Sequence, residues 1–196
     1  MDHMDGLAVS DCPYCPALVD SRSQVVNGGG PEDADLVFVG EAPGAQEDEQ
    51  GEPFVGRSGS LLDETLRDVG LARADVRITN CVRCRPPENR DPTAEELDNC
   101  RGYLEHELEQ VDPEVVVTLG KVPSEHLLGR DVAVTNEAGA VEPAELGGKR
   151  RRVLICVHPA ATFYDRSQES TFEATIEKAA ELAGAVDGGQ AGLDDF

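Results

Sequence analysis

The stretch LVFVGEAPGAQEDEQGEPFVGRSG, residues 36–59, joins an apolar run to a glycine-rich turn that leads into a helical pattern. The run Leu36–Val39 predicts a buried strand, and residues 60–69 predict an amphipathic helix. Glycines between a strand and a helix let the backbone turn sharply and approach a ligand closely. The stretch therefore predicts an α/β fold with a site at the carboxyl end of its first strand.

The rest of the chain repeats this alternation of strand and helix. Further strands are predicted at residues 76–79, 115–119 and 153–157, and further helices at 93–109, 122–128 and 172–183. Thr93 and Glu96 have the spacing of a capping box at the start of the second helix. Such alternation favours a mainly parallel sheet covered on both faces. We expect a three-layer α/β/α sandwich with a four-stranded central sheet, in which residues 130–152 form a hairpin or loop.

Length and composition indicate one ordinary domain. The chain has 196 residues, of which we assign 1–185 to the domain and the acidic, glycine-rich residues 186–196 to a disordered tail. No apolar run approaches the roughly 18–20 residues that cross a bilayer, and the first ten residues lack the pattern of a secretory signal. We expect a cytoplasmic monomer without membrane contact; the sequence identifies no protein partner, such as a sliding clamp.

The net charge of −22 argues against nucleic-acid binding when taken alone, because phosphate contacts usually require a basic surface. Lysine occurs only at positions 121, 149 and 178. A surface so rich in carboxylates fits adaptation to high salt, where a Debye length of about 3 Å screens their repulsion. The same salt screens attraction to phosphate, so DNA binding would depend on backbone amides, stacking and shape.

Four strand ends carry polar or glycine-rich motifs. Gly40 and Glu41 follow the first strand, Asn80 ends the second, Gly120 and Lys121 follow the third, and His158 follows the last. In open α/β sheets, ligands bind at the carboxyl ends of the strands. These motifs therefore predict a single pocket.

The six cysteines stand at positions 12, 15, 81, 84, 100 and 156. In a chain without a secretory signal, metal ligation is favoured over disulfides. Spacing alone pairs Cys12/Cys15 with Cys81/Cys84 as two CxxC knuckles around zinc.

Four ordered motifs resemble the family-4, iron-sulfur uracil-DNA glycosylases. They are CPYC at 12–15, residues 40–59, ITNCVRCRPPENR at 78–90 followed by Cys100, and VHPAA at 157–161. The resemblance implies a monofunctional enzyme that hydrolyses the glycosidic bond of flipped-out deoxyuridine in DNA, releases uracil and leaves an abasic site. It also implies a [4Fe-4S] cluster held by Cys12, Cys15, Cys84 and Cys100, with zinc as the alternative. Cys81 and Cys156 are then expected to be buried apolar residues.

The resemblance also assigns roles in uracil binding. Phe54 is expected to stack on the base, and Asn80 to accept from uracil N3–H while donating to O4, a pattern that cytosine reverses. His158 is expected to donate to O2 of the leaving uracil. Gly40 and Ala42 are expected to complete the uracil-binding site. Ala42 stands where family-1 enzymes carry a catalytic Asp.

Two carboxylates compete for the attacking water. Glu41 is the first choice, and Glu47 is the second or else crowds uracil C5 against the thymine methyl. In a chain with 39 Asp and Glu residues, either side chain also fits a plain solvated acid.

The DNA contacts are assigned to loops. Arg57, Ser58 and Gly59, together with Gly120 and Lys121, precede helices and offer amides to phosphate. Phe163, Tyr164 or Arg166 is expected to wedge into the duplex. The basic run Lys149–Arg152 fits a solvated hairpin as well as a DNA contact.

Two other readings remain open. A related branch of the superfamily traps uracil covalently through a histidine in a basic insertion, but residues 85–100 contain neither histidine nor lysine. A small acidic iron-sulfur or zinc protein for electron transfer or binding fits the composition, but it leaves Glu41, Phe54, Asn80 and His158 unexplained.

Overall fold

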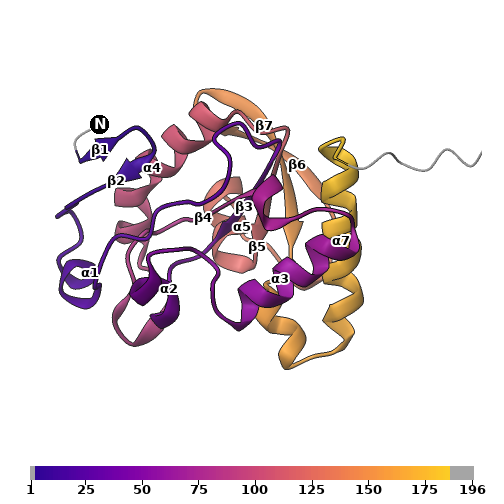
Figure 1. Cartoon of the computed structure of the whole chain (residues 1–196), viewed down its shortest axis with the longest axis horizontal. Helices are drawn as coiled ribbons and strands as arrows, with labels where there is room; N and C mark the ends of the chain where they lie inside the picture. The colour runs from indigo at the N-terminus through magenta and orange to yellow at the C-terminus, as the bar shows by residue number, and fades with distance from the viewer. Residues whose placement is uncertain (1–2, 186–196) are drawn as a thin grey trace, which may run out of the picture.

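The computed structural model describes residues 3–185, which form a central sheet with helices on both faces (Figure 1). The sheet has the strand order β4-β3-β5-β7-β6. Its strands are β3 (Leu36–Gly40), β4 (Arg77–Asn80), β5 (Val115–Leu119), β6 (Val141–Leu146) and β7 (Lys149–Cys156). The pairs β3/β4, β3/β5 and β5/β7 are parallel, whereas β6 runs antiparallel to β7.

The prediction of a four-stranded sheet is therefore wrong, because the sheet has five strands. The additional strand β6 lies at the edge of the sheet, and most of its residues are only partly buried. Pro143 sits within it, opposite Arg152, at a position that an edge strand tolerates because one side makes no ladder bonds. Its polar composition and its proline hide β6 from a search for apolar runs. The expected hairpin in residues 130–152 is confirmed, since β6 and β7 form one.

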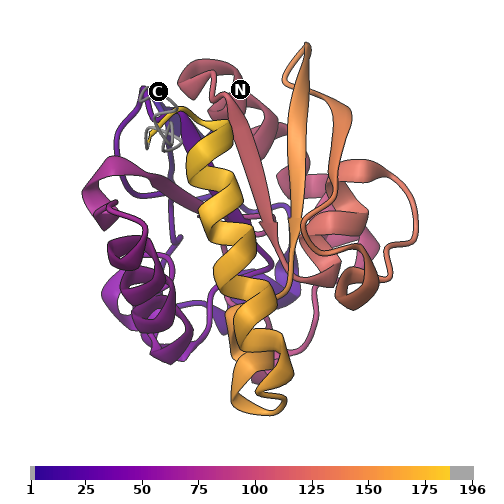
Figure 2. The ribbon, with the colours of Figure 1, turned by 90° about the vertical axis from the view of Figure 1, so that its right-hand side faces the viewer.

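Alternate residues of the strands face two separate cores, which confirms the three-layer arrangement. Phe38, Ile78 and Val117 face α3 (Arg57–Asp68) and α7 (Ser167–Leu182). Val37, Val39 and Val116 face α4 (Ala94–Val111) and α5 (Lys121–Leu128). Figure 2 shows α7 running across one face of the sheet with α3 beside it. Near-continuous apolar strands are the expected result of burial on both faces.

The residues at which the helices begin are where the structure differs most from the prediction. α3 begins at Arg57 rather than at residue 60, and α7 begins at Ser167 rather than at residue 172. Their first turns are polar and carry no apolar periodicity. By contrast, the Thr93 capping box is confirmed: Thr93 Oγ1 accepts from the Glu96 N–H at 3.2 Å, and the Glu96 carboxylate accepts from the Thr93 N–H at 2.8 Å.

Several short elements were not predicted. The N-terminal segment forms an antiparallel pair, β1 (Met4–Asp5) with β2 (Ala8–Val9), followed by α1 (Pro16–Ser21). Two further short helices are α2 (Ala45–Gln50) and α6 (Val134–Glu137). Helices of four to six residues are too short to show a period.

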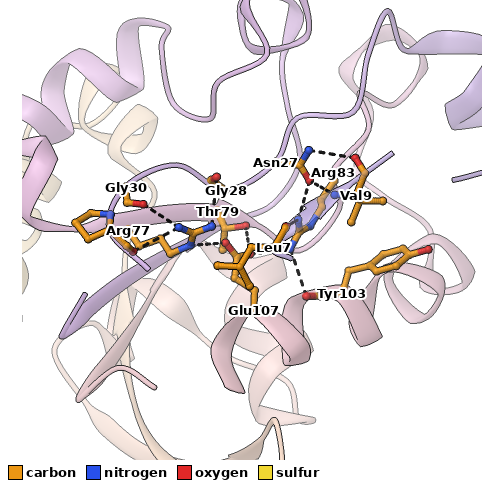
Figure 3. Close-up of polar contacts among 11 residues, drawn as sticks. Leu7, Val9, Asn27, Gly28, Gly30, Arg77, Thr79, Arg83, Tyr103 and Glu107 are labelled. Carbon is orange, nitrogen blue, oxygen red and sulfur yellow. Dashed lines mark hydrogen bonds and ion pairs between the residues drawn. The ribbon is translucent and has the colours of Figure 1, made fainter. Parts of the chain in front are cut away.

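The N-terminal segment is attached to the sheet by a buried ion-pair network centred on Glu107 of α4 (Figure 3). The Glu107 carboxylate accepts from Arg77 Nε at 2.6 Å, from the Thr79 hydroxyl at 2.8 Å and from Arg83 at 2.8 Å. Arg83 also donates to the Leu7 carbonyl and to Asn27 Oδ1. Because Glu107 is fully buried, these three donors are what offset the cost of removing its charge from water.

The predicted tail at 186–196 lies outside the described residues, and the assignment of 1–185 to a single domain stays a prediction. Within residues 3–185, no helix combines the length and apolar character needed to cross a membrane.

Candidate active site

A cavity of about 210 Å³ lies where the predicted motifs meet. Its lining comes from the loop after β3, from α2, from the loop between α2 and α3, from the start of α3, from the end of β4 and from the segment after β7. The lining residues are Ala42, Gly44, Glu47, Phe54, Ser58, Asn80 and His158. The cavity is smaller than the roughly 300–1,000 Å³ pockets of drug-sized ligands, so its volume suits a single small ring.

Gly40 permits the close packing of the cavity wall. A Cβ atom at this position would lie 2.4 Å from Asn80 Oδ1 and 2.4 Å from Phe54 Cε2. Gly40 pairs with Asn80 across β3 and β4, so the glycine leaves room for the amide and the aromatic ring side by side. Any larger residue would displace one of them.

Asn80 lines the cavity and holds a hydrogen-bond acceptor without a partner among the described residues. Its side chain is 3% exposed, and Oδ1 has no partner among the described residues. Burying a polar atom without a partner costs free energy. An unpaired acceptor on a residue that lines a cavity is the feature expected of a group whose hydrogen bonding a ligand completes.

Phe54 lies in the cavity wall with an unusual backbone. Its φ is 53°, in the left-handed region that bulky residues rarely adopt. The ring is buried, and its centroid lies 6.0 Å from that of His158. The left-handed conformation is stabilised by contacts of the backbone with Arg73, a residue that sequence reasoning did not single out.

His158 is held as a neutral imidazole with its Nε2 proton available. The Ala160 N–H donates to Nδ1 at 3.1 Å, so Nδ1 is the acceptor and Nε2 carries the hydrogen in the neutral ring. Burial lowers the pKa of His158 to about 4, because the charged ring would lose its hydration. This hydrogen bond thus identifies the tautomer that carries its proton on Nε2.

The two carboxylates occupy different places. Glu47 lines the cavity, and its oxygens accept from the N–H of Gly44 and of Gly56, each at 3.1 Å. Glu41 is not among the lining residues. Burial, with a smaller contribution from Asp91, raises the pKa of Glu41 to about 7. Of the two carboxylates, Glu47 lies in the cavity lining, and the choice between them for the attacking water stays a prediction.

Two of the loops assigned to DNA, the start of α3 and the turn after His158, contact each other. The Arg57 guanidinium stacks on the Phe163 ring at 3.8 Å from its centroid, which joins the start of α3 to the turn after His158. Ser58 lines the cavity, and Gly59 is buried in α3. Tyr164, next to Phe163, is 92% exposed.

The other predicted DNA contacts are more dispersed. Gly120 precedes α5 and packs against His158, because a Cβ at Gly120 would lie 3.1 Å from that of His158. Lys121 is exposed, with its amine 3.7 Å from Glu125. Arg166 is exposed at the start of α7.

The basic run Lys149–Arg152 lies at the start of β7, at the strand end remote from His158. Lys149 and Arg151 both pair with Asp112, at 2.8 and 2.7 Å, and Arg152 pairs with Glu114 at 2.8 Å. These contacts favour the reading as a solvated hairpin.

The cysteines fall into two groups. Cys12, Cys84 and Cys100 are buried in one cluster, with Cys15 packed against it. Cys81 and Cys156 lie in the two cores of the sheet, as predicted, and burial raises the pKa of both thiols. The four grouped sulfurs each face a donor: Arg22 reaches Cys84 at 2.9 Å, Asn99 reaches Cys15 at 3.5 Å, Tyr103 reaches Cys12 at 3.5 Å, and the Arg83 backbone bonds Cys100.

This cysteine group does not have the close spacing of ligands around one ion. Among residues 3–185, no three His, Cys, Asp or Glu side chains are arranged to hold a single metal ion. The all-sulfur donor set and its surrounding hydrogen-bond donors are nevertheless of the kind that stabilises thiolates in iron-sulfur proteins.

Comparison with known proteins identifies the class. Residues 27–181 match the profile of the Uracil DNA glycosylase superfamily, and the chain belongs to that superfamily. Its relatives narrow the assignment to the type-4 branch. The chain is 40% identical over 190 residues to the type-4 uracil-DNA glycosylase of Archaeoglobus fulgidus, covering 94% of this chain and 95% of the relative. It is 44% identical over 163 residues to that of Thermotoga maritima, covering 82% of each chain.

The type-5 branch is more distant. The type-5 uracil-DNA glycosylase of Pyrobaculum aerophilum is 31% identical over 205 residues, covering 88% of this chain and 86% of the relative. The chain therefore belongs with the type-4 enzymes, in agreement with the resemblance of its motifs.

Proposed function

We propose that the chain is a monofunctional uracil-DNA glycosylase that hydrolyses the N-glycosidic bond of deoxyuridine flipped out of DNA into the 210 Å³ cavity. The observation that carries the proposal is the open acceptor of buried Asn80 beside the neutral, proton-bearing His158. Products are free uracil and an abasic site, the first step of base excision repair. We propose that it acts in the cytoplasm as a monomer.

Recognition rests on Asn80 and Phe54. Asn80 Oδ1 accepts from uracil N3–H, and its amide group donates to O4. Cytosine presents an acceptor at N3 and a donor at N4, so the same orientation would leave two buried groups unpaired. The Phe54 ring supplies a stacking face, while Gly40 and Ala42 keep the wall close to the base.

Bond cleavage rests on His158. As the bond from C1′ to N1 breaks, negative charge develops on uracil and positive charge on the sugar. The His158 Nε2–H donates to O2 and stabilises the uracil anion. His158 suits this task because its pKa of about 4 keeps the imidazole neutral throughout the physiological pH range.

We assign Glu47 to the sugar and the attacking water, since it lines the cavity and its carboxylate is held by two backbone amides. Glu41 is the second candidate. A pKa near 7 is suited to a general base, but such a base must also reach the water.

Products are released without strand cleavage, because that reaction needs an amine nucleophile. The cavity lining, as far as residues 3–185 define it, includes no lysine.

DNA binding is assigned to the loops beside the cavity. Arg57, Ser58 and Gly59, with Gly120 and Lys121, contact the phosphates. Of the three wedge candidates, Tyr164 is favoured, because Phe163 already packs under Arg57 and Tyr164 is freely exposed. Arg166 would contact the backbone beside the wedge. The acidic remainder of the surface fits an enzyme that works at high salt.

We further propose that Cys12, Cys15, Cys84 and Cys100 hold a [4Fe-4S] cluster rather than zinc. Their grouping apart from Cys81 supports this ligand set over the two CxxC pairs, which would require Cys81. When bound, the cluster supplies a cross-link between the N-terminal segment, the β4–α4 loop and α4.

The recognition step is tested with Asn80→Asp. Wild-type protein should release uracil from an oligonucleotide with a U·G pair and nothing from one with C·G. The variant should release uracil at least about a hundredfold more slowly, because a buried unpaired group replaces a hydrogen bond. Uracil release at the wild-type rate by Asn80→Asp would contradict the assignment.

A further inference from the structure

Phe54 adopts a costly backbone conformation at the point where the ring enters the cavity. Its φ of 53° belongs to the left-handed region, where a bulky side chain crowds its own backbone. Such residues persist only where surrounding contacts hold them. The contacts that hold Phe54 therefore also hold its ring beside Asn80 and His158.

Arg73 makes those contacts. Its Nη1 donates to the Phe54 carbonyl at 3.1 Å, and its Nη2 donates to the carbonyl of Pro53. Both peptide units that flank the strained residue are thus bound by one guanidinium. A planar fork with fixed geometry restrains two carbonyls in a way that a single amine does not.

Two features of α3 complete the arrangement. Asp63 accepts from Arg73 Nη1 at 3.0 Å and orients the guanidinium. Gly59 lets the helix approach the loop, because a Cβ atom there would lie 1.7 Å from the Phe54 carbonyl oxygen. The side chains of Arg73 and Asp63 are 31% and 30% exposed, and neither residue lines the cavity.

We propose that Arg73 is a positioning residue for base recognition, which acts on the flipped uracil through the backbone of Phe54. The inference rests on the proposed glycosylase function and extends it to a residue outside the cavity. Without the guanidinium, the 53–55 segment is free to relax toward an extended backbone, which would turn the ring away from Gly40 and Asn80. The base would then lose its stacking face while His158 and Glu47 stay in place.

A double-mutant cycle separates this role from simple stabilisation. Arg73→Gln should lower kcat/KM for uracil release about tenfold in the wild-type background. In a Phe54→Ala background the same substitution should change kcat/KM less than about twofold, because the ring through which Arg73 acts is gone. Unfolding midpoints are measured on the same four proteins, so that loss of folded protein is not counted as loss of rate.

Arg67→Gln is the matched control, because it removes the same charge from an exposed position on α3 and should leave kcat/KM unchanged. If Arg73→Gln does not fold, Arg73→Lys is used in the same cycle, with a smaller loss expected. Equal losses of kcat/KM in both backgrounds, or no loss in either, would overturn the inference. The proposed function would still hold in that case, provided that wild type releases uracil. Absence of release by wild type would instead overturn the proposed function, and this inference with it.

Discussion

The two faces of strand β4 use buried polar groups in opposite ways. Arg77 and Thr79 point toward α4, where Glu107 accepts hydrogen bonds from both and from Arg83 (Figure 3). Asn80 belongs to the opposite face, and its Oδ1 has no partner among the described residues. Buried polar groups stabilise a fold when all of their hydrogen bonds are made, whereas an acceptor without a partner can bind a ligand. The comparison predicts that damage to the Glu107 network reduces stability, and that damage to the cavity reduces activity.

The largest effect is expected from Glu107→Gln. Removing one partner of a buried ion pair leaves two arginines without their carboxylate, which should lower the free energy of unfolding by about 3–5 kcal/mol. Urea unfolding at fixed salt measures the loss. Uracil release per folded molecule should stay within about threefold of wild type.

Glu109→Gln is the matched control, since Glu109 lies on the same helix with a 60% exposed side chain. It should change the free energy of unfolding by less than about 0.5 kcal/mol. If Glu107→Gln kept full stability but abolished uracil release, the division between the two faces of β4 would be wrong.

The next largest effect, on the rate of uracil release, is expected from the two candidate carboxylates, Glu47 and Glu41. Glu47→Gln should slow uracil release by about a hundredfold, whereas Glu41→Gln should slow it far less, because only Glu47 lines the cavity. Single-turnover rates measure both. The pH profile gives a second test, because protonation of Glu41 occurs as pH falls through about 7.

If Glu41 does not activate the water, wild-type rates should stay nearly constant between about pH 6 and 8 and should fall as His158 becomes charged near pH 4. A fall in rate through pH 7 on acidification, absent in Glu41→Gln, would return the water-activating role to Glu41.

The smallest effect on stability is expected at the cysteine group. Cys100→Ser should abolish iron binding and the visible absorbance of the anaerobically purified protein, whereas Cys81→Ser should keep both. The unfolding midpoint of Cys100→Ser should fall less than that of Glu107→Gln, because the Glu107 network still attaches the N-terminal segment through Arg83 and Asn27. Loss of metal in Cys81→Ser, with retention in Cys100→Ser, would favour the zinc pairing instead.

Sequence reasoning identified the parts of the fold that carry a local signal. Strands β3 and β5 and the second half of β7 are apolar runs, and the motifs at the strand ends converge because parallel strands share one carboxyl edge. Strand β6 has no such signal, since its pairing with β7 decides its structure despite Pro143. The β6–β7 hairpin was expected as a hairpin or loop in residues 130–152, but neither its strands nor their place in the sheet was predicted from that segment.

The missed features of the site depend on contacts distant in the chain. Nothing local marks Phe54 as left-handed, because the restraint comes from Arg73, nineteen residues away. The placement of Glu47 rather than Glu41 in the cavity lining depends in the same way on the path of the glycine-rich loop. A positive φ at a bulky residue is a tertiary effect that residue types do not reveal.

The central claim, that the cavity cleaves uracil from DNA through a neutral His158, is tested most directly by uracil release from wild type and His158→Gln. Release is followed by chromatography, with abasic sites counted after alkali and both proteins checked for equal unfolding midpoints. The account predicts equimolar uracil and abasic sites from wild type, and a rate lower by about 10²–10³ in the variant, the usual cost of removing one transition-state donor. Equal rates in the two proteins, or no release by folded wild type at any salt concentration, would contradict it.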